Sequence, residues 1–118
     1  MSREFVFSTL RLISEDIEKS INFISSVFNI SFIERDDRFA RFNLNNVNVE
    51  LIAEDNKNPC STGGAIGYWK VKDLDSILNK VKANGGIVYR GPLVVSENNT
   101  RIAQIKGPAG CMLGFEEV

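Results

Sequence analysis

Apolar residues recur along the chain at two kinds of spacing, which predict short strands and two amphipathic helices. Residues 5–13 alternate apolar and polar positions and are rich in Phe, Val, Thr and Leu, as strands are. After Asp16, apolar residues recur every three or four positions, which places them on one stripe of a helix. They are Ile17, Ile21, Ile24 and Phe28. Asp16 suits the N-cap of this helix, and Asn29 suits its end.

Three further strand patterns complete the first half of the chain. They cover residues 30–35, 38–44 and 47–54. The pairs Asp36-Asp37 and Asn45-Asn46 separate them, and Asn tolerates the positive φ of tight turns. Residues 55–64 then combine Asn, Lys, Pro, Ser, Thr and Gly with little apolar content, which indicates a linker.

The same order then begins again. Residues 65–71 read as a strand, and Asp73 caps a second predicted helix that ends at Asn84-Gly85-Gly86. Its buried stripe is Leu74, Ile77, Leu78 and Val81. Three more strands follow, at 87–96, 100–106 and 111–117, with a turn at Glu97-Asn98-Asn99 between the first two. Gly91-Pro92 interrupts the first of them and marks an edge or a bulge, because proline cannot donate to a ladder.

The chain therefore reads as two tandem βαβββ modules, residues 1–54 and 65–118, joined by linker 55–64. A repeat of this kind indicates duplication. We predict one α+β domain over residues 1–118, which is an ordinary length for a single core. An unrelated α+β sandwich with the same element count is the alternative.

Charge and cysteine content exclude several classes of function. The formal net charge is −1 and no basic face is evident, so we expect no nucleic-acid partner. No apolar run is long enough for a membrane span or a signal peptide, so we expect a cytoplasmic protein. Cys60 and Cys111 have no C-x-x-C spacing and give neither a zinc motif nor a disulfide framework, so we interpret them as reduced thiols.

The chain has no histidine. This excludes Ser-His-Asp and Cys-His nucleophilic machinery, histidine zinc sites and the facial triad of non-haem iron. Any chemistry must therefore use carboxylates, Lys, Tyr or Cys.

Three segments together resemble the vicinal oxygen chelate superfamily, which includes glyoxalases, bleomycin-resistance proteins and extradiol dioxygenases. They are residues 9–20, residues 66–75, and the turn Gly107-Pro108-Ala109-Gly110 with the strand up to Phe115. The resemblance spans nearly the whole chain, although none of the three segments is very specific alone. It implies the glyoxalase/bleomycin-resistance fold, in which each module curls four strands into a half-barrel and the two halves form a cup.

The resemblance also implies where metal ligands would lie. Metal-using members place four ligands on the first and fourth strands of each module, and these positions fall on Thr9, Glu50, Ile66 and Gly114. Only Glu50 is a good ligand, and a divalent ion takes four to six. We therefore predict no metal site. A two-residue slip would bring Glu116 in place of Gly114, which still leaves the two first-strand ligands absent.

Strand alternation predicts which side chains line the cup. They are Thr9, Arg11, Glu50, Ile66, Tyr68, Lys70, Met112 and Gly114. Some of these residues also have a structural alternative. Arg11 and Glu50 can form an ion pair in place of the metal, and Tyr68 can be a core residue. Lys70 is expected to reach solvent at the rim, and Gly114 marks either clearance for a ligand or close backbone packing. Trp69 points to the opposite face, under a helix.

Three functions fit this pattern. The favoured one is a non-catalytic protein that binds a small organic molecule in the cup with neither metal nor cofactor. The second is a divergent lyase, isomerase or dioxygenase of the same superfamily, with unusual metal ligands or with Glu50 as general base. The third is a structural or regulatory domain whose cup is filled by its own side chains. A homodimer is expected in all three cases.

Overall fold

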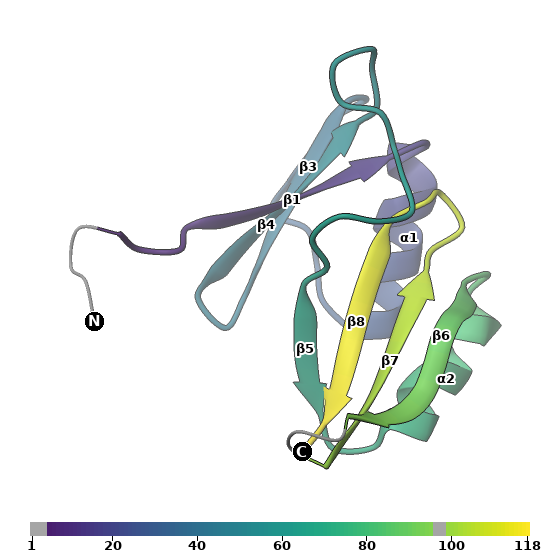
Figure 1. The fold of residues 1–118 in the computed structure, drawn as a ribbon. Helices are drawn as coiled ribbons and strands as arrows, with labels where there is room; N and C mark the ends of the chain where they lie inside the picture. Colours follow the sequence, from purple (N-terminus) through teal and green to yellow (C-terminus); the bar gives the residue numbers. More distant parts are fainter. Residues whose placement is uncertain (1–4, 96–98) are drawn as a thin grey trace.

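A computed structural model describes residues 5–95 and 99–118 of the chain. Its elements follow the order βαβββ–βαβββ, which confirms the α+β class and the two tandem modules (Figure 1). The first module holds β1 (Thr9–Ser14), α1 (Ile17–Phe28), β2 (Glu34–Arg35), β3 (Phe39–Leu44) and β4 (Val47–Ala53). The second holds β5 (Tyr68–Val71), α2 (Leu74–Ala83), β6 (Ile87–Val95), β7 (Thr100–Lys106) and β8 (Met112–Glu117).

Each module forms its own four-stranded sheet with the same topology. The strand orders are β1-β4-β3-β2 and β5-β8-β7-β6, and the first strand of each module pairs in parallel with the last. The two sheets cross at a steep angle and do not close into a barrel (Figure 1). The half-barrels expected from the resemblance are therefore present as two separate sheets.

Both helices begin at the predicted caps. The Asp16 side chain accepts a hydrogen bond from the Lys19 backbone N–H, and Asp73 does the same for Ser76. These bonds satisfy donors that the first turn of a helix leaves free. Helix α1 ends at Asn29, whose φ of 55° is left-handed. None of the helices in the described ranges is long and apolar enough to span a membrane.

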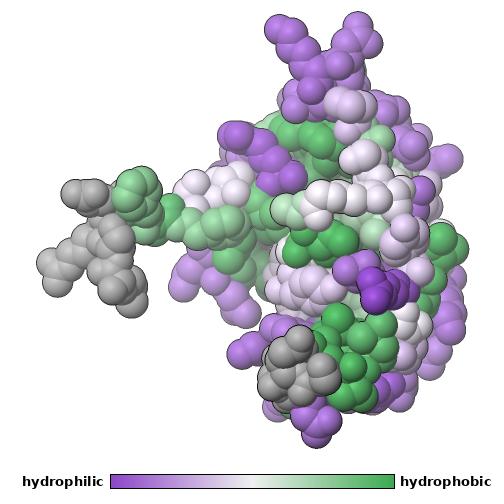
Figure 2. Space-filling model, viewed as in Figure 1, coloured by the Kyte–Doolittle hydropathy of each residue, from purple (hydrophilic) through white to green (hydrophobic). Residues whose placement is uncertain are grey.

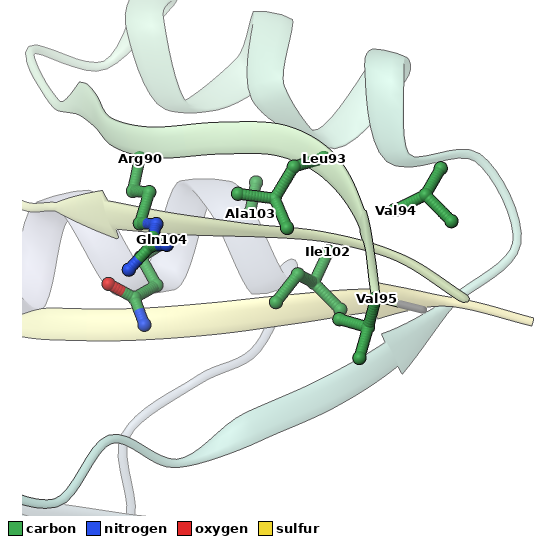
Figure 3. Close-up of a pocket in the computed structure, with 7 residues that line it drawn as sticks. All are labelled: Arg90, Leu93, Val94, Val95, Ile102, Ala103 and Gln104. Carbon is green, nitrogen blue, oxygen red and sulfur yellow. The ribbon is translucent and has the colours of Figure 1, made fainter. Parts of the chain in front are cut away.

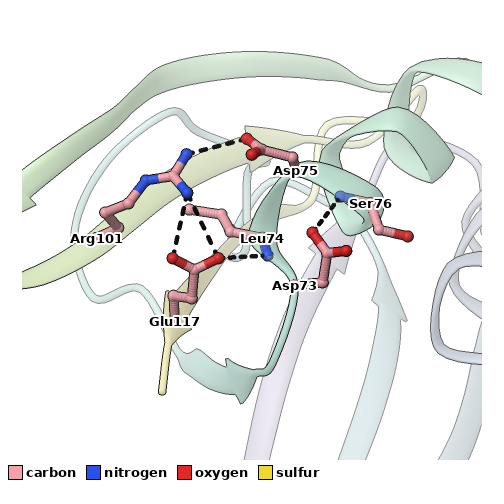
Figure 4. Close-up of polar contacts among 6 residues, drawn as sticks. All are labelled: Asp73, Leu74, Asp75, Ser76, Arg101 and Glu117. Atoms are coloured by element: carbon pink, nitrogen blue, oxygen red, sulfur yellow. Dashed lines mark hydrogen bonds and ion pairs between the residues drawn. The ribbon is translucent and has the colours of Figure 1, made fainter.

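The start of α2 is also tied to its sheet by charge. Glu117 of β8 accepts a hydrogen bond from the Leu74 backbone N–H at 2.9 Å, where a carboxylate complements the helix dipole (Figure 4). Arg101 of β7 donates to Glu117 and also to Asp75 of the helix, at 3.2 and 2.9 Å. This network fixes α2 across β7 and β8.

The helices share one core with the inner faces of both sheets. The ring of Phe28 in α1 contacts Phe42 of the first sheet and Phe115 of the second. Trp69 packs edge-on against the same ring, with centroids 5.2 Å apart, as predicted for a residue under a helix. One face of each sheet is thus covered by helix, and the other, here called the open face, carries no helix (Figure 1).

Several predicted strands are shorter in the structure. Strand β1 begins at Thr9 rather than residue 5, and Phe5, Val6 and Phe7 extend from the body, 70–81% exposed (Figures 1 and 2). Alternation alone predicted a strand there, but these residues have no partner strand within the described chain. Strand β5 begins at Tyr68, so Ile66 precedes it. Strand β2 has only two residues. Ser96 and most of the predicted Glu97-Asn98-Asn99 turn lie outside the described residues.

Candidate functional site

The open face of the first sheet carries a row of alternating charges. The register places Arg11, Glu50, Arg41 and Glu34 side by side on β1, β4, β3 and β2. Arg11 Nε donates to Glu50 Oε1 and Arg41 Nε to Glu34 Oε1, both at 2.7 Å. Opposite charges on directly paired strand positions stabilise a sheet. The Arg11–Glu50 ion pair considered from the sequence is therefore present.

Glu50 has a partner for each of its carboxylate oxygens. Asn48 Nδ2 donates to Glu50 Oε2 at 3.0 Å, and the same amide lies 3.3 Å from Thr9 Oγ1. The hydrogen bond from Arg11 lowers the pKa of Glu50 most; burial opposes it, and Asn48 lowers that pKa further. A carboxylate with a lowered pKa and two occupied oxygens is a weak general base.

The second sheet carries a different polar row. Tyr68, Gly114, Gln104 and Arg90 occupy paired positions on β5, β8, β7 and β6. Gln104 Nε2 donates to Tyr68 Oη at 2.9 Å, across the intervening Gly114. A Cβ at Gly114 would lie 2.6 Å from two carbons of the Tyr68 ring, so the ring occupies the space above the glycine. Gly114 therefore marks close packing of Tyr68.

Beside this row lies a groove of about 320 Å³ on β6 and β7 (Figure 3). It is lined by Arg90, Leu93, Val94, Val95, Ile102, Ala103 and Gln104. Its volume falls within the usual range for small-molecule sites. We call it the β6–β7 groove.

An irregularity in β6 shapes this groove. Arg90 pairs with Gln104, and Leu93 pairs with Ile102. Between these two pairs β6 advances by three residues while β7 advances by two, so β6 contains a β-bulge. The bulge contains Gly91, whose φ is +93°, and a Cβ there would lie 2.8 Å from the Ile102 carbonyl oxygen. Only glycine fits this position. The bulge lets Arg90 and Leu93 face the same side as Gln104 and Ile102.

The other predicted residues lie apart from this groove. Met112 is buried and, with Arg11, lines a small pocket of about 130 Å³ between the first sheet, the linker and β8. Lys70 is exposed, as predicted, and Ile66 is half-buried ahead of β5. The structure thus brings Thr9, Arg11 and Glu50 together on one sheet and Tyr68 with Gly114 on the other.

The residues at the implied metal positions do not fit a metal ion. Glu50 is engaged by Arg11 and Asn48, and Gly114 lies beneath Tyr68 on the other sheet. In residues 5–95 and 99–118 no group of three or more His, Cys, Asp or Glu side chains is placed to hold a metal ion. We therefore assign no chemistry to a metal here.

Sequence reasoning missed Arg90, Leu93, Ile102 and Gln104. It followed the first and fourth strands of each module, where the resemblance implies ligands. Alternation along residues 100–106 puts Ile102 and Gln104 on one face, so the sequence could have predicted the β7 side of the groove. The register shift that adds Arg90 and Leu93 was not readable, because only Gly91-Pro92 hinted at a bulge.

Comparison with known protein families identifies the superfamily of this chain. The family model described as "Glyoxalase/Bleomycin resistance protein/Dioxygenase superfamily" matches residues 6–115. The chain belongs to this superfamily. The vicinal oxygen chelate resemblance is thereby confirmed. A comparison with curated proteins found no match.

Solved structures of the superfamily share the fold at low sequence identity. A glyoxalase/bleomycin resistance protein/dioxygenase family enzyme from Burkholderia phytofirmans PsJN has a TM-score of 0.81 at 16% identity, over 97% of this chain and 99% of that one. A glyoxalase-related enzyme from Fulvimarina pelagi has a TM-score of 0.76 at 14% identity, over 94% and 86%. The bleomycin-binding protein from Streptomyces verticillus, complexed with copper(II)-bleomycin, has a TM-score of 0.70 at 14% identity, over 100% and 99%.

Proposed function

We propose that this superfamily member binds a small organic molecule on its open sheet faces without using a metal ion of its own. The β6–β7 groove carries the proposal, because it combines apolar walls with a few polar groups, the usual make-up of a small-molecule site. A neighbour of the same fold is a bleomycin-binding protein, which makes binding without chemistry a reasonable role for this architecture. Ligand contacts by Thr9, Arg11, Glu50, Ile66, Tyr68, Lys70 and Met112, none of which lines the groove itself, stay part of this proposal, whereas Gly114 lies beneath the Tyr68 ring.

The local chemistry favours this role over the two alternatives. Glu50 is the base that a metal-free enzyme of this family would use, and its hydrogen bonds to Arg11 and Asn48 lower its basicity. A structural domain with a filled cup is disfavoured because the β6–β7 groove is open to a ligand.

We further propose a homodimer that completes the cavity. Strands β1 and β5 are sheet edges, and Phe5, Val6 and Phe7 extend from β1 with most of their surface exposed. Exposed sheet edges and exposed apolar segments, such as this arm of residues 5–7, favour pairing with another chain. A second copy would cover the arm and set its open faces against those of the first. We expect residues 1–118 to act as one cytoplasmic domain, which the two free thiols suit.

Thermal unfolding with Mg, Mn, Fe, Ni or Zn ions tests the metal-free claim, because an ion that binds only the folded state raises the melting temperature. We expect no ion to raise it. Glu50→Ala, at the implied metal position, is compared with Glu34→Ala, which removes another carboxylate from the same row. Stabilisation by one ion that Glu50→Ala abolishes and Glu34→Ala retains would overturn the proposal in favour of a metalloenzyme.

Light scattering after size exclusion tests the dimer. We expect a mass of two chains for the unmodified protein and of one chain when Phe5 and Phe7 are both replaced by Ser. Ser26→Ala, on an exposed position of α1, is the control that keeps the dimer. A single-chain mass for the unmodified protein at high concentration would refute this part of the proposal.

A further inference from the structure

We propose that the β6–β7 groove is specific for an organic anion: a carboxylate bound by Arg90, attached to an apolar body that lies on Leu93 and Ile102. This inference rests on the proposed function and adds the chemical class of the ligand. Figure 3 shows Arg90 and Gln104 at one end of the groove and the aliphatic side chains along the rest.

Arg90 supplies the charge. Its side chain is exposed and takes part in none of the ion pairs within residues 5–95 and 99–118, whereas Arg11, Arg35, Arg41 and Arg101 are each bound to a carboxylate. The bulge at Gly91 holds Arg90 over the groove beside Gln104. A guanidinium offers two parallel N–H groups that match a carboxylate.

The neighbouring polar groups are also donors. Tyr68 Oη accepts a hydrogen bond from Gln104, so its own O–H hydrogen remains available to a ligand. Among the described residues, none that lines the groove is acidic. In the part of the chain that the structure describes, the nearest acid on the same face by register is Glu116 of β8, which is paired with Ile102 and lies one row away from Gln104. An anion at the Arg90 end thus meets donors, and no carboxylate of residues 5–95 or 99–118 lines the groove there.

The other end of the groove suits an apolar group. Leu93, Val95 and Ile102 are each half-buried and lie on the open face by the register of β6 and β7. Covering such aliphatic surface is favourable in proportion to the area removed from water. A ligand that joins a carboxylate to a ring or short chain satisfies both ends at once, whereas an inorganic anion would satisfy only one.

The test is an NMR titration of ¹⁵N-labelled protein with 4-phenylbutanoate and, separately, with 4-phenylbutanamide. The two compounds have nearly the same shape, and only the first carries a charge. We expect the acid to shift the backbone amides of Leu93, Ile102 and Gln104 and to bind at least about tenfold more tightly than the amide, the usual worth of a hydrogen bond to a charged group.

Arg90→Met keeps most of the aliphatic stem and removes the charge, so it should weaken binding of the acid about tenfold and leave the amide unchanged. Arg38→Met, at an exposed arginine just before β3 that takes part in none of the ion pairs above, is the matched control and should change neither. Arg90→Lys should retain part of the preference for the acid, because it keeps the charge and loses the planar fork.

The outcomes separate this inference from the proposed function. Equal binding of acid and amide in the groove would refute the anion preference and leave small-molecule binding intact. No shift of groove amides by either compound at millimolar concentration would overturn the inference. Metal stabilisation through Glu50 would remove the proposed function, whatever the groove binds.

Discussion

The packing of Tyr68 over Gly114 gives the sharpest test of the second sheet. A Cβ on Gly114 would lie 2.6 Å from the ring, closer than real Cβ contacts occur, so Gly114→Ala must displace the ring. Displacement also breaks the 2.9 Å hydrogen bond from Gln104 to Tyr68. We assign about 1–3 kcal/mol to overpacking and about 1 kcal/mol to the hydrogen bond. Alanine in a strand recovers about 0.5–1 kcal/mol relative to glycine, which leaves a net loss of about 2 kcal/mol.

The same substitution should have the opposite sign once the ring is gone. In a Tyr68→Ala background the three atoms nearest to the new methyl group are gone, so Gly114→Ala should stabilise by about 0.5–1 kcal/mol. The double-mutant cycle therefore predicts a coupling of about 2.5–3 kcal/mol, at the upper end for residues in contact. Urea unfolding of the four proteins measures it. An equal effect of Gly114→Ala in both backgrounds would show that the ring does not lie over the glycine.

Three further predictions concern ionisable groups and caps. The pKa of Glu50 is lowered in the folded state, so its contribution to stability is present above the unfolded pKa and is lost as pH falls through the folded value. Glu50→Gln should thus lower the free energy of unfolding by about 1 kcal/mol near neutral pH and leave it unchanged at strongly acidic pH; the figure is modest because the Arg11 side chain is 67% exposed. A loss of stability in urea unfolding that does not depend on pH would contradict this. Burial raises the pKa of Cys111 to about 11 and also raises that of Cys60, so an aromatic disulfide reagent at pH 8, followed by absorbance, should label Cys60 slowly and Cys111 only when the protein unfolds. Fast labelling of both thiols in the folded protein would contradict the burial of Cys111. Asp73→Ala removes the N-cap of α2 and should lower the melting temperature by about 4 °C, which corresponds to about 1 kcal/mol of stability. An unchanged melting temperature in calorimetry would show that this cap does not stabilise the protein.

Features set by neighbours in the sequence were predictable. The stripe from Ile17 to Phe28 and the caps Asp16 and Asp73 follow from helix periodicity and from short side chains that bond the next turn. The repeat of the two modules followed from the order of these local signals. The superfamily could be recognised for the same reason, because its identifying segments are also local.

Features set by strands that meet only in the fold were not predictable. Alternation across residues 5–8 looks the same with or without a partner strand, so the pattern predicts a strand from residue 5, whereas β1 begins at Thr9. The groove depends on a register shift in β6 that brings Arg90 opposite Gln104. No periodicity encodes which residue a bulge skips, and a one-residue error moves every following side chain to the other face.

The two implied fourth-strand metal positions, Glu50 and Gly114, differ in what surrounds them, and this difference bears on function. On the first sheet Glu50 is paired with Arg11, which neutralises its charge and keeps the face polar. On the second sheet the ligand position is Gly114, and Tyr68 fills the space above it. Restoring one carboxylate at Gly114 would meet the ring of Tyr68, while Glu50 would still be paired with Arg11. A metal site at these two positions would need changes on both sheets, so we look first to the groove beside Arg90 for a ligand.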